Sequence, residues 1–96
     1  MSSNRVAAEP HPQLETERVK VTEWRFAPGA ETGWHTHAYD YVVVPMTSGT
    51  LLLETDDGEV TAELRAGVSY TREAGVKHNV INANSFDFSF VEVEIK

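Results

Sequence analysis

The chain has 96 residues, a formal net charge of −7, no cysteine and no apolar run close to the length of a membrane span. A chain of this length forms one domain. The acidic balance, without a cluster of Lys and Arg, argues against nucleic acid and anionic membranes as partners. The lack of cysteine excludes disulfides and thiol nucleophiles. With no signal-peptide pattern behind Met1, we expect a cytoplasmic domain.

The first part of the chain, residues 1–18, is polar and has no clear period. Pro10 and Pro12 flank His11 within it. We expect residues 1–18 to form a flexible arm, an extended segment laid along a neighbouring surface, or an arm exchanged between the subunits of a dimer, ahead of a barrel over residues 19–96.

Short β-rich segments separated by turn signals follow one another from Val19 to the end of the chain. The turn signals are Pro28-Gly29, Ser48-Gly49, Asp56-Asp57-Gly58, Ala66-Gly67 and Ala74-Gly75. The predicted strands are residues 19–26, 39–46, 50–55, 59–64, 68–71, 76–81 and 86–95. Because no window of ten residues has a helical stripe, this pattern predicts an all-β sandwich or barrel.

The large aromatic residues are expected mainly to fill the core of so small a barrel. They are Trp24, Phe26, Trp34, Phe86, Phe88 and Phe90. In the last predicted strand the apolar positions change parity between Phe90 and Val91. That change predicts either a bulge or a strand covered on both faces.

Three of the four histidines fall in two short segments. His35 and His37 are two residues apart, so on a strand their side chains share one face, about 6.6 Å apart along the backbone. His78 follows the turn at Gly75 and enters a strand, where it could reach the same point from across a sheet. Taken alone, His35 and His37 could equally well be two surface histidines on one strand with no metal between them. Together, His35, His37 and His78 predict one divalent transition-metal ion: Fe, Mn, Ni, Cu or Zn.

These segments resemble the two motifs of the cupin family. The matching positions are Gly29, His35-Thr36-His37 and Gly49 in the first motif, and Gly67, Glu73-Ala74-Gly75, His78 and Asn82 in the second. The resemblance covers about residues 19 to 96. It implies a single-domain cupin double-stranded β-helix, which is an antiparallel jelly-roll barrel with the metal inside. Residues 23–35 and 66–72 also resemble, more loosely, bacterial cupins named as β-alanine degradation proteins.

The match departs from the family pattern where a Glu usually supplies a further ligand. Tyr41 and Val42 stand at those positions. Asp40 comes one residue early and would point away on a regular strand, unless a bulge turned it inward. Glu73, which replaces the family's Pro, is expected to be a solvated turn carboxylate. A site of three neutral imidazoles leaves the full charge on the ion and makes it a stronger Lewis acid.

Two further residues are candidates for a catalytic role. The phenol of Tyr41 could donate a hydrogen bond beside the open position of the ion, and a buried packing role is the equal alternative. Arg72 could clamp a substrate carboxylate, although a surface position or an ion pair is the plainer reading. Asn82 is expected to fix a turn by hydrogen bonding, and His11 to lie outside the site.

Three-histidine cupin sites resemble those of thiol dioxygenases and diketone-cleaving dioxygenases. The resemblance implies a metal-dependent oxygenase acting on a small oxygenated acid or dicarbonyl, with a lyase or isomerase as a variant. Without cysteine, the Cys–Tyr crosslink of some thiol dioxygenases is excluded. The alternatives are a non-catalytic cupin that binds a small molecule or is stabilised by its metal, and a vestigial site in a barrel kept for assembly. Cupins that resemble this chain commonly pair through a sheet, which implies a homodimer.

Overall fold

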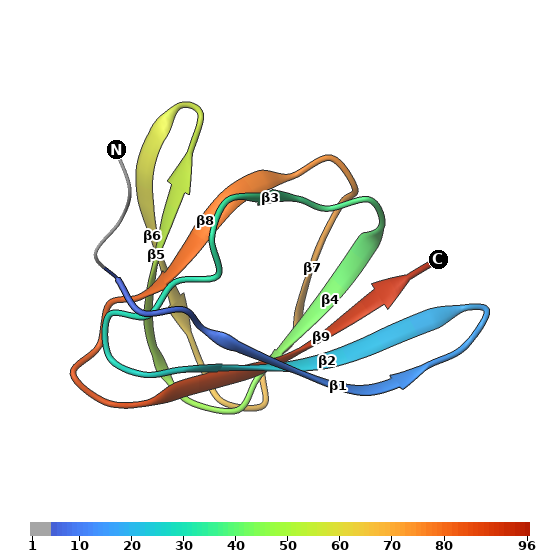
Figure 1. Ribbon diagram of the computed structural model, residues 1–96, viewed down its shortest axis with the longest axis horizontal. Helices are drawn as coiled ribbons and strands as arrows, with labels where there is room; N and C mark the ends of the chain where they lie inside the picture. The colour runs from blue at the N-terminus through green and yellow to red at the C-terminus, as the bar shows by residue number, and fades with distance from the viewer. Residues whose placement is uncertain (1–4) are drawn as a thin grey trace.

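The computed structural model describes residues 5–96, which form nine strands (Figure 1). They are β1 (Glu9–Glu15), β2 (Val19–Phe26), β3 (His35–Thr36), β4 (Asp40–Pro45), β5 (Gly49–Thr55), β6 (Gly58–Leu64), β7 (Tyr70–Arg72), β8 (Lys77–Asn82) and β9 (Phe88–Ile95). Over this range no helix is long and apolar enough to cross a membrane.

Two antiparallel sheets make up the barrel. One has five strands in the order β1-β2-β9-β4-β7, and the other has four in the order β3-β8-β5-β6. In Figure 1 the five-stranded sheet runs along the bottom and right, and the four-stranded sheet closes the barrel at the upper left. The prediction of an all-β antiparallel jelly roll is confirmed.

The predicted strands match the observed ones within a few residues, because turn residues separate them. Pro45 ends β4 beyond Val43, the last residue of β4 that pairs with β7. A proline, which has no N–H to donate, is tolerated there because the β4–β7 pairing has ended, and its carbonyl still accepts a hydrogen bond from the N–H of Gly67 at 2.8 Å.

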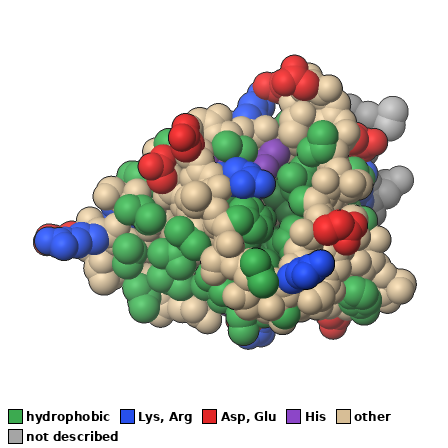
Figure 2. All heavy atoms as spheres, turned by 180° about the vertical axis from the view of Figure 1, so that it is seen from behind, with side chains coloured by type: hydrophobic (Ala, Val, Ile, Leu, Met, Phe, Trp, Pro, Cys, Tyr) green, Lys and Arg blue, Asp and Glu red, His purple; other side chains and the backbone are tan. Residues whose placement is uncertain are grey.

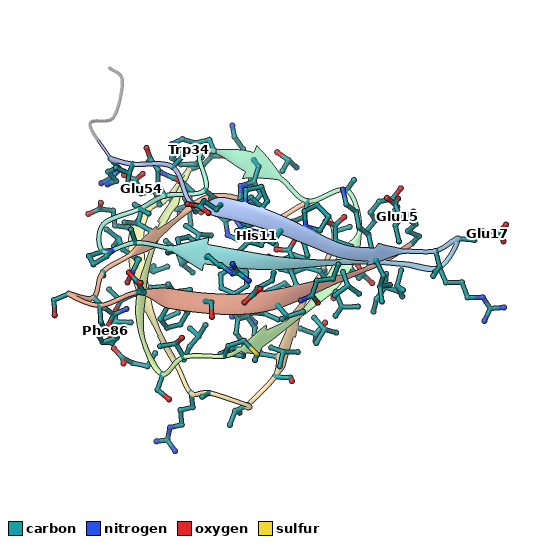
Figure 3. The ribbon with its side chains drawn as sticks, turned by 60° about the horizontal axis from the view of Figure 1, so that its bottom comes forward. His11, Glu15, Glu17, Trp34, Glu54 and Phe86 are labelled. Atoms are coloured by element: carbon teal, nitrogen blue, oxygen red, sulfur yellow. The ribbon has the colours of Figure 1, made fainter. Side chains whose placement is uncertain are left out.

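Residues 9–15 form an extended segment that lies along the edge of the five-stranded sheet. They form β1, which pairs antiparallel with β2 from Glu9↔Arg25 to Glu15↔Lys20, with an irregularity between Pro12 and Leu14. The free edge of β2 supplies backbone partners for this polar segment, and an edge strand accommodates its prolines. Figure 3 shows β1 beside β2, as the edge strand of the sheet. Residues 1–4 lie outside the described part of the chain, and exchange of the arm between subunits stays a prediction.

The core lies between the two sheets. Phe26, Phe88 and Leu51 are its largest fully buried apolar side chains, and Phe90 packs on Phe26 with ring centroids 5.4 Å apart. Trp34 and Phe86 do not fill the core as expected, since their side chains are 50% and 45% exposed. Both precede a strand in a loop, where no second sheet covers them.

Strand β9 runs through the predicted parity change without a bulge. Its register with β2 and with β4 is continuous from Phe90 to Ile95. Phe88, Phe90 and Glu92 are buried on the inner face, while Val91 and Val93 are half-buried on the outer face. The strand is therefore covered on one side only, and a carboxylate takes an inward position.

Candidate metal centre

Three histidine side chains converge inside the barrel at one end of the four-stranded sheet. His35 on β3 lies directly opposite His78 on β8, and His37 follows just after β3. The Nε2 atom of His37 lies 3.0 Å from Nε2 of His35 and 3.1 Å from Nε2 of His78. Two nitrogens bound to one ion by bonds of about 2.1 Å lie about 3.0–3.4 Å apart, so these separations fit a shared ion. Among the described residues, these three form the group that could hold a metal ion.

The ring of His35 is held in the form that a metal requires. Its Nδ1 lies 2.8 Å from the carbonyl oxygen of Gly33, which can only accept a hydrogen bond. The neutral ring therefore carries its proton on Nδ1 and turns the lone pair of Nε2 toward the other two histidines. This second hydrogen bond is the usual way in which a protein orients a metal-binding imidazole.

Burial keeps the other two imidazoles neutral. Desolvation, and then the charges of His35 and His78, lower the pKa of His37 to about 4. Desolvation, with smaller effects of His35 and Arg72, lowers the pKa of His78 to about 4. At neutral pH both rings therefore keep a lone pair for a ligand bond.

A buried amide ties the two histidine segments together. Asn79, next to His78, accepts a hydrogen bond from the N–H of Gly33 at 2.9 Å. Its amide nitrogen donates to Glu31 and to Glu54, each at 2.8 Å. The loop that carries His35 is thus fixed to β8 by side-chain bonds as well as by the short β3–β8 pairing.

Tyr41 lies against the site and Asp40 does not. The Tyr41 ring stacks on the imidazole of His37, with centroids 3.8 Å apart, and is 2% exposed. Burial raises the pKa of its phenol, and the charge of Glu92 adds to this effect. Asp40 is exposed and accepts a hydrogen bond from the N–H of Ala74 at 2.8 Å. Without a bulge, Asp40 faces away from the histidines, as a regular strand predicts.

Arg72 lies at the opening of the barrel. Its guanidinium stacks on the ring of Tyr70 at 4.6 Å, and one of its nitrogens donates to the carbonyl of Thr71 at 2.9 Å. Figure 2 shows histidine (purple) in a hollow of this side of the molecule, with a basic side chain next to it and hydrophobic side chains around it.

A narrow cavity lies between the histidines and the five-stranded sheet. Its volume is about 30 Å³, which holds about two water molecules. His78, Tyr41, Tyr70, Arg72 and Glu92 are the polar residues that line it.

Glu92 is a residue of this cavity that the sequence did not single out. Its side chain is buried on the inner face of β9. Desolvation, followed by the charge of Glu94 and a hydrogen bond with it, raises the pKa of Glu92 to about 7. The alternation Phe86, Phe88, Phe90, Glu92 was the available signal, because period 2 places the carboxylate on the side of the phenylalanines.

The remaining residues considered in the sequence analysis lie away from the Nε2 atoms of the three histidines. Asn82 donates to the carbonyls of Phe26, Ala27 and Phe86, which confirms its predicted role in fixing turns. Glu73 is exposed in a turn, as expected. His11 lies on β1 and contacts Glu9 at 3.2 Å (Figure 3).

Comparison with known proteins agrees with this architecture. The family model described as "Cupin domain" matches residues 22–94. The chain is 61% identical to the beta-alanine degradation protein BauB of Pseudomonas aeruginosa over 94 residues, 98% of this chain and 99% of that one. It is 63% identical to a cupin domain from Bordetella pertussis, whose crystal structure matches with a TM-score of 0.96 over 99% of both chains. A Klebsiella pneumoniae protein with a double-stranded β-helix domain is 26% identical, with a TM-score of 0.77 over 99% of this chain and 81% of that one. This chain belongs to the cupin domain family.

Proposed function

We propose that the protein binds one divalent transition-metal ion per chain on His35, His37 and His78, and that the ion serves a reaction on a small oxygenated acid or dicarbonyl. The observation that carries the proposal is the approach of the three Nε2 atoms, with the proton of His35 held on Nδ1. Three imidazoles accept Fe, Mn, Ni, Cu or Zn, and cellular supply decides among them.

The reaction that we propose is an oxygenation. A three-histidine ion keeps open positions and its full charge, and when bound it would act as a Lewis acid that favours anionic ligands. The protein's own part is to cover the His37 ring with Tyr41, to hold the imidazole of His35 in one tautomer through Gly33, and to present Arg72 at the opening. The Pseudomonas relative is named for beta-alanine degradation.

Elemental analysis of the purified protein tests the metal site. We expect close to one ion per chain in the wild type and almost none in His78→Ala, which removes one of the three convergent nitrogens. His11→Ala is the matched control, since His11 lies outside the site on β1. Added metal should raise the melting temperature of the wild type and of His11→Ala, and not that of His78→Ala.

The reaction is tested separately. The Fe(II)-loaded protein should consume O₂ with at least one member of a panel of dicarbonyls and oxo acids, and His35→Ala should not. Binding of such a compound without O₂ uptake would reject the oxygenase and leave a metal-dependent binding protein. A metal content far below one ion per chain, with no thermal stabilisation, would reject the metal site itself.

We further propose that the protein works in the cytoplasm as a homodimer. Two copies of a chain of net charge −7 repel each other least when they meet through a row of uncharged side chains. The central row of the outer face of the five-stranded sheet is uncharged, and its test is given in the Discussion.

A further inference from the structure

The five-stranded sheet presents two polar rows to the barrel interior, opposite the histidines. The first row crosses four strands in register: Thr22 pairs with Glu92, Glu92 with Val43, and Val43 with Tyr70. Residues that pair directly on neighbouring antiparallel strands point to the same face. Thr22, Glu92 and Val43 are buried and Tyr70 is half-buried, so this row faces inward.

The second row lies one step closer to the opening. Lys20 pairs with Glu94, Glu94 with Tyr41, and Tyr41 with Arg72. These residues are two positions along each strand from the first row, so they share its face. The charged and titratable groups facing Glu92 are therefore Lys20, Glu94, Tyr41, Tyr70 and Arg72 from its own sheet, and His78 from the opposite sheet.

The position of Glu92 is costly for a structural residue. A buried carboxylate is unfavourable unless it is paired, and burial dominates its environment here. The attraction of Lys20 is the smallest effect on it, and no ion pair found among residues 5–96 includes Glu92. A leucine at this position would extend the row of Phe88 and Phe90. The carboxyl lines the same cavity as His78 and Arg72, so it can reach the part of a bound molecule that enters this cavity of about 30 Å³.

We propose that Glu92 is the proton-exchanging group of this site and that Arg72 holds the carboxylate of the substrate, which is a small 3-oxo acid. The proposal rests on the metal site proposed above and specifies the substrate class. A 3-oxo acid offers a partner for each of these two side chains. Its carboxylate can pair with the guanidinium of Arg72, and its acidic C–H, which lies between two carbonyl groups, can give a proton to Glu92.

The exchange step is a simple proton transfer. The carboxylate of Glu92 takes the proton from C2 of the acid, and the electron pair of the broken C–H bond forms the enolate of the substrate. Glu92 is then a neutral carboxylic acid, and it returns the proton to C2 in the reverse step. A group that titrates near neutral pH is suited to both directions.

Hydrogen exchange of acetoacetate in deuterium oxide tests this proposal. The Co(II)-loaded protein is compared with Glu92→Gln and Arg72→Gln, and Glu59→Gln on the exposed hairpin strand β6 is the matched control. NMR follows exchange at C2, calorimetry gives the Kd, and elemental analysis gives the Co(II) content of each sample. Acetylacetone, a dicarbonyl without a carboxylate, is the second probe.

We expect Glu92→Gln to bind acetoacetate with a Kd within about threefold of the wild type and to exchange C2 at least about 100-fold more slowly. Arg72→Gln should weaken acetoacetate binding by roughly tenfold or more and leave acetylacetone binding unchanged. Glu59→Gln should behave as the wild type with both probes.

The outcomes separate this inference from the metal site. If the wild type takes up no Co(II), the proposed function fails and this inference fails with it. If it takes up Co(II) and Glu92→Gln exchanges as fast as the wild type, or no loaded protein exceeds buffer alone, the role of Glu92 is wrong and the metal site stands. If Arg72→Gln weakens both probes equally, Arg72 does not recognise the carboxylate.

Discussion

At the scale of single residues, the histidines could be predicted from the sequence and Glu92 could not. His35 and His37 show their shared face by their spacing, and His78 follows a turn glycine at a strand start. Glu92 has only an ambiguous sign, because its spacing from Phe88 and Phe90 places it inward while Val91, Val93 and Ile95 offer a second apolar face on the other parity. The register of β9 between β2 and β4 decides between the two faces and shows that the side chain of Glu92 points inward.

The buried carboxyl of Glu92 makes a pH-dependent contribution to stability. Its pKa is about 7 in the folded chain and near 4.5 in the unfolded chain. Below pH 4.5 both states are protonated and Glu92 has no effect. Between pH 4.5 and 7 the unfolded state ionises first, so the fold loses stability, by about 3 kcal/mol in all, and the loss is constant above pH 7.

Urea unfolding of metal-free protein tests this effect. The difference in unfolding free energy between Glu92→Gln and the wild type should rise by about 3 kcal/mol, in favour of the variant, from pH 4.5 to pH 7.5. His37 and His78 titrate in both proteins, so their effects cancel in the difference. Glu59→Gln controls for the change in net charge and should not show this rise. A difference that does not change with pH would contradict the account.

At the scale of elements, the positions of the strands could be predicted from the turn residues between them. Which strands pair with one another could not. Most of the strands from β2 to β9 are bounded by turns that contain Gly, Pro or Asp, and these turns can be recognised in the sequence. Strand β1 lacks apolar alternation and contains two prolines, so nothing local predicts it. It exists because β2 offers an unpaired edge, which is a property of the finished sheet.

The loop before β3 sets the metal site through a single glycine. Gly33 has a φ of +87°, donates to Asn79 and accepts from His35. A Cβ at this position meets no neighbour within 4 Å, so Gly33→Ala changes the backbone conformation and creates no clash. Because a side chain disfavours this φ, the loop should shift and carry the His35 ring with it.

We therefore expect Gly33→Ala to lower metal affinity by about tenfold, the lower end of the range for loss of support around a metal ligand. Gly58→Ala is the matched control, with a φ of +113° and open space in the β5–β6 hairpin. Both variants should lose about 1–2 kcal/mol of stability, and only Gly33→Ala should lose metal affinity. Titration with Co(II) and urea unfolding measure the two effects. Equal affinities would show that the loop does not position His35.

At the scale of the whole molecule, the five-stranded sheet carries one uncharged row across the middle of its outer face, with Glu23 and Arg25 on one side of this row and Asp40 on the other. One outer row runs from Leu14 to Val21, Val93, Val42 and Thr71, in register across five strands. None of these side chains is charged, although the chain carries 15 acidic residues. Figure 3 looks onto this side of the sheet. An uncharged row on an acidic protein is suited to contact with a second copy, because it brings no like charges together at the centre of the contact.

Substitution at the centre of this face tests the homodimer. A standard interface takes about 800 Å² from each partner, a small share of the 5933 Å² surface of this chain, so one sheet face is large enough. Light scattering at micromolar concentration should give twice the 10.7 kDa chain mass for the wild type and the single mass for Val93→Glu. The control is Val60→Glu, an exposed residue of β6 on the other sheet, which should remain a dimer.

Because Val93 points away from the cavity, Val93→Glu should keep its metal, and a monomer that still binds Co(II) would show that each barrel builds its site alone. A monomeric wild type, or a dimeric Val93→Glu, would contradict pairing through this face.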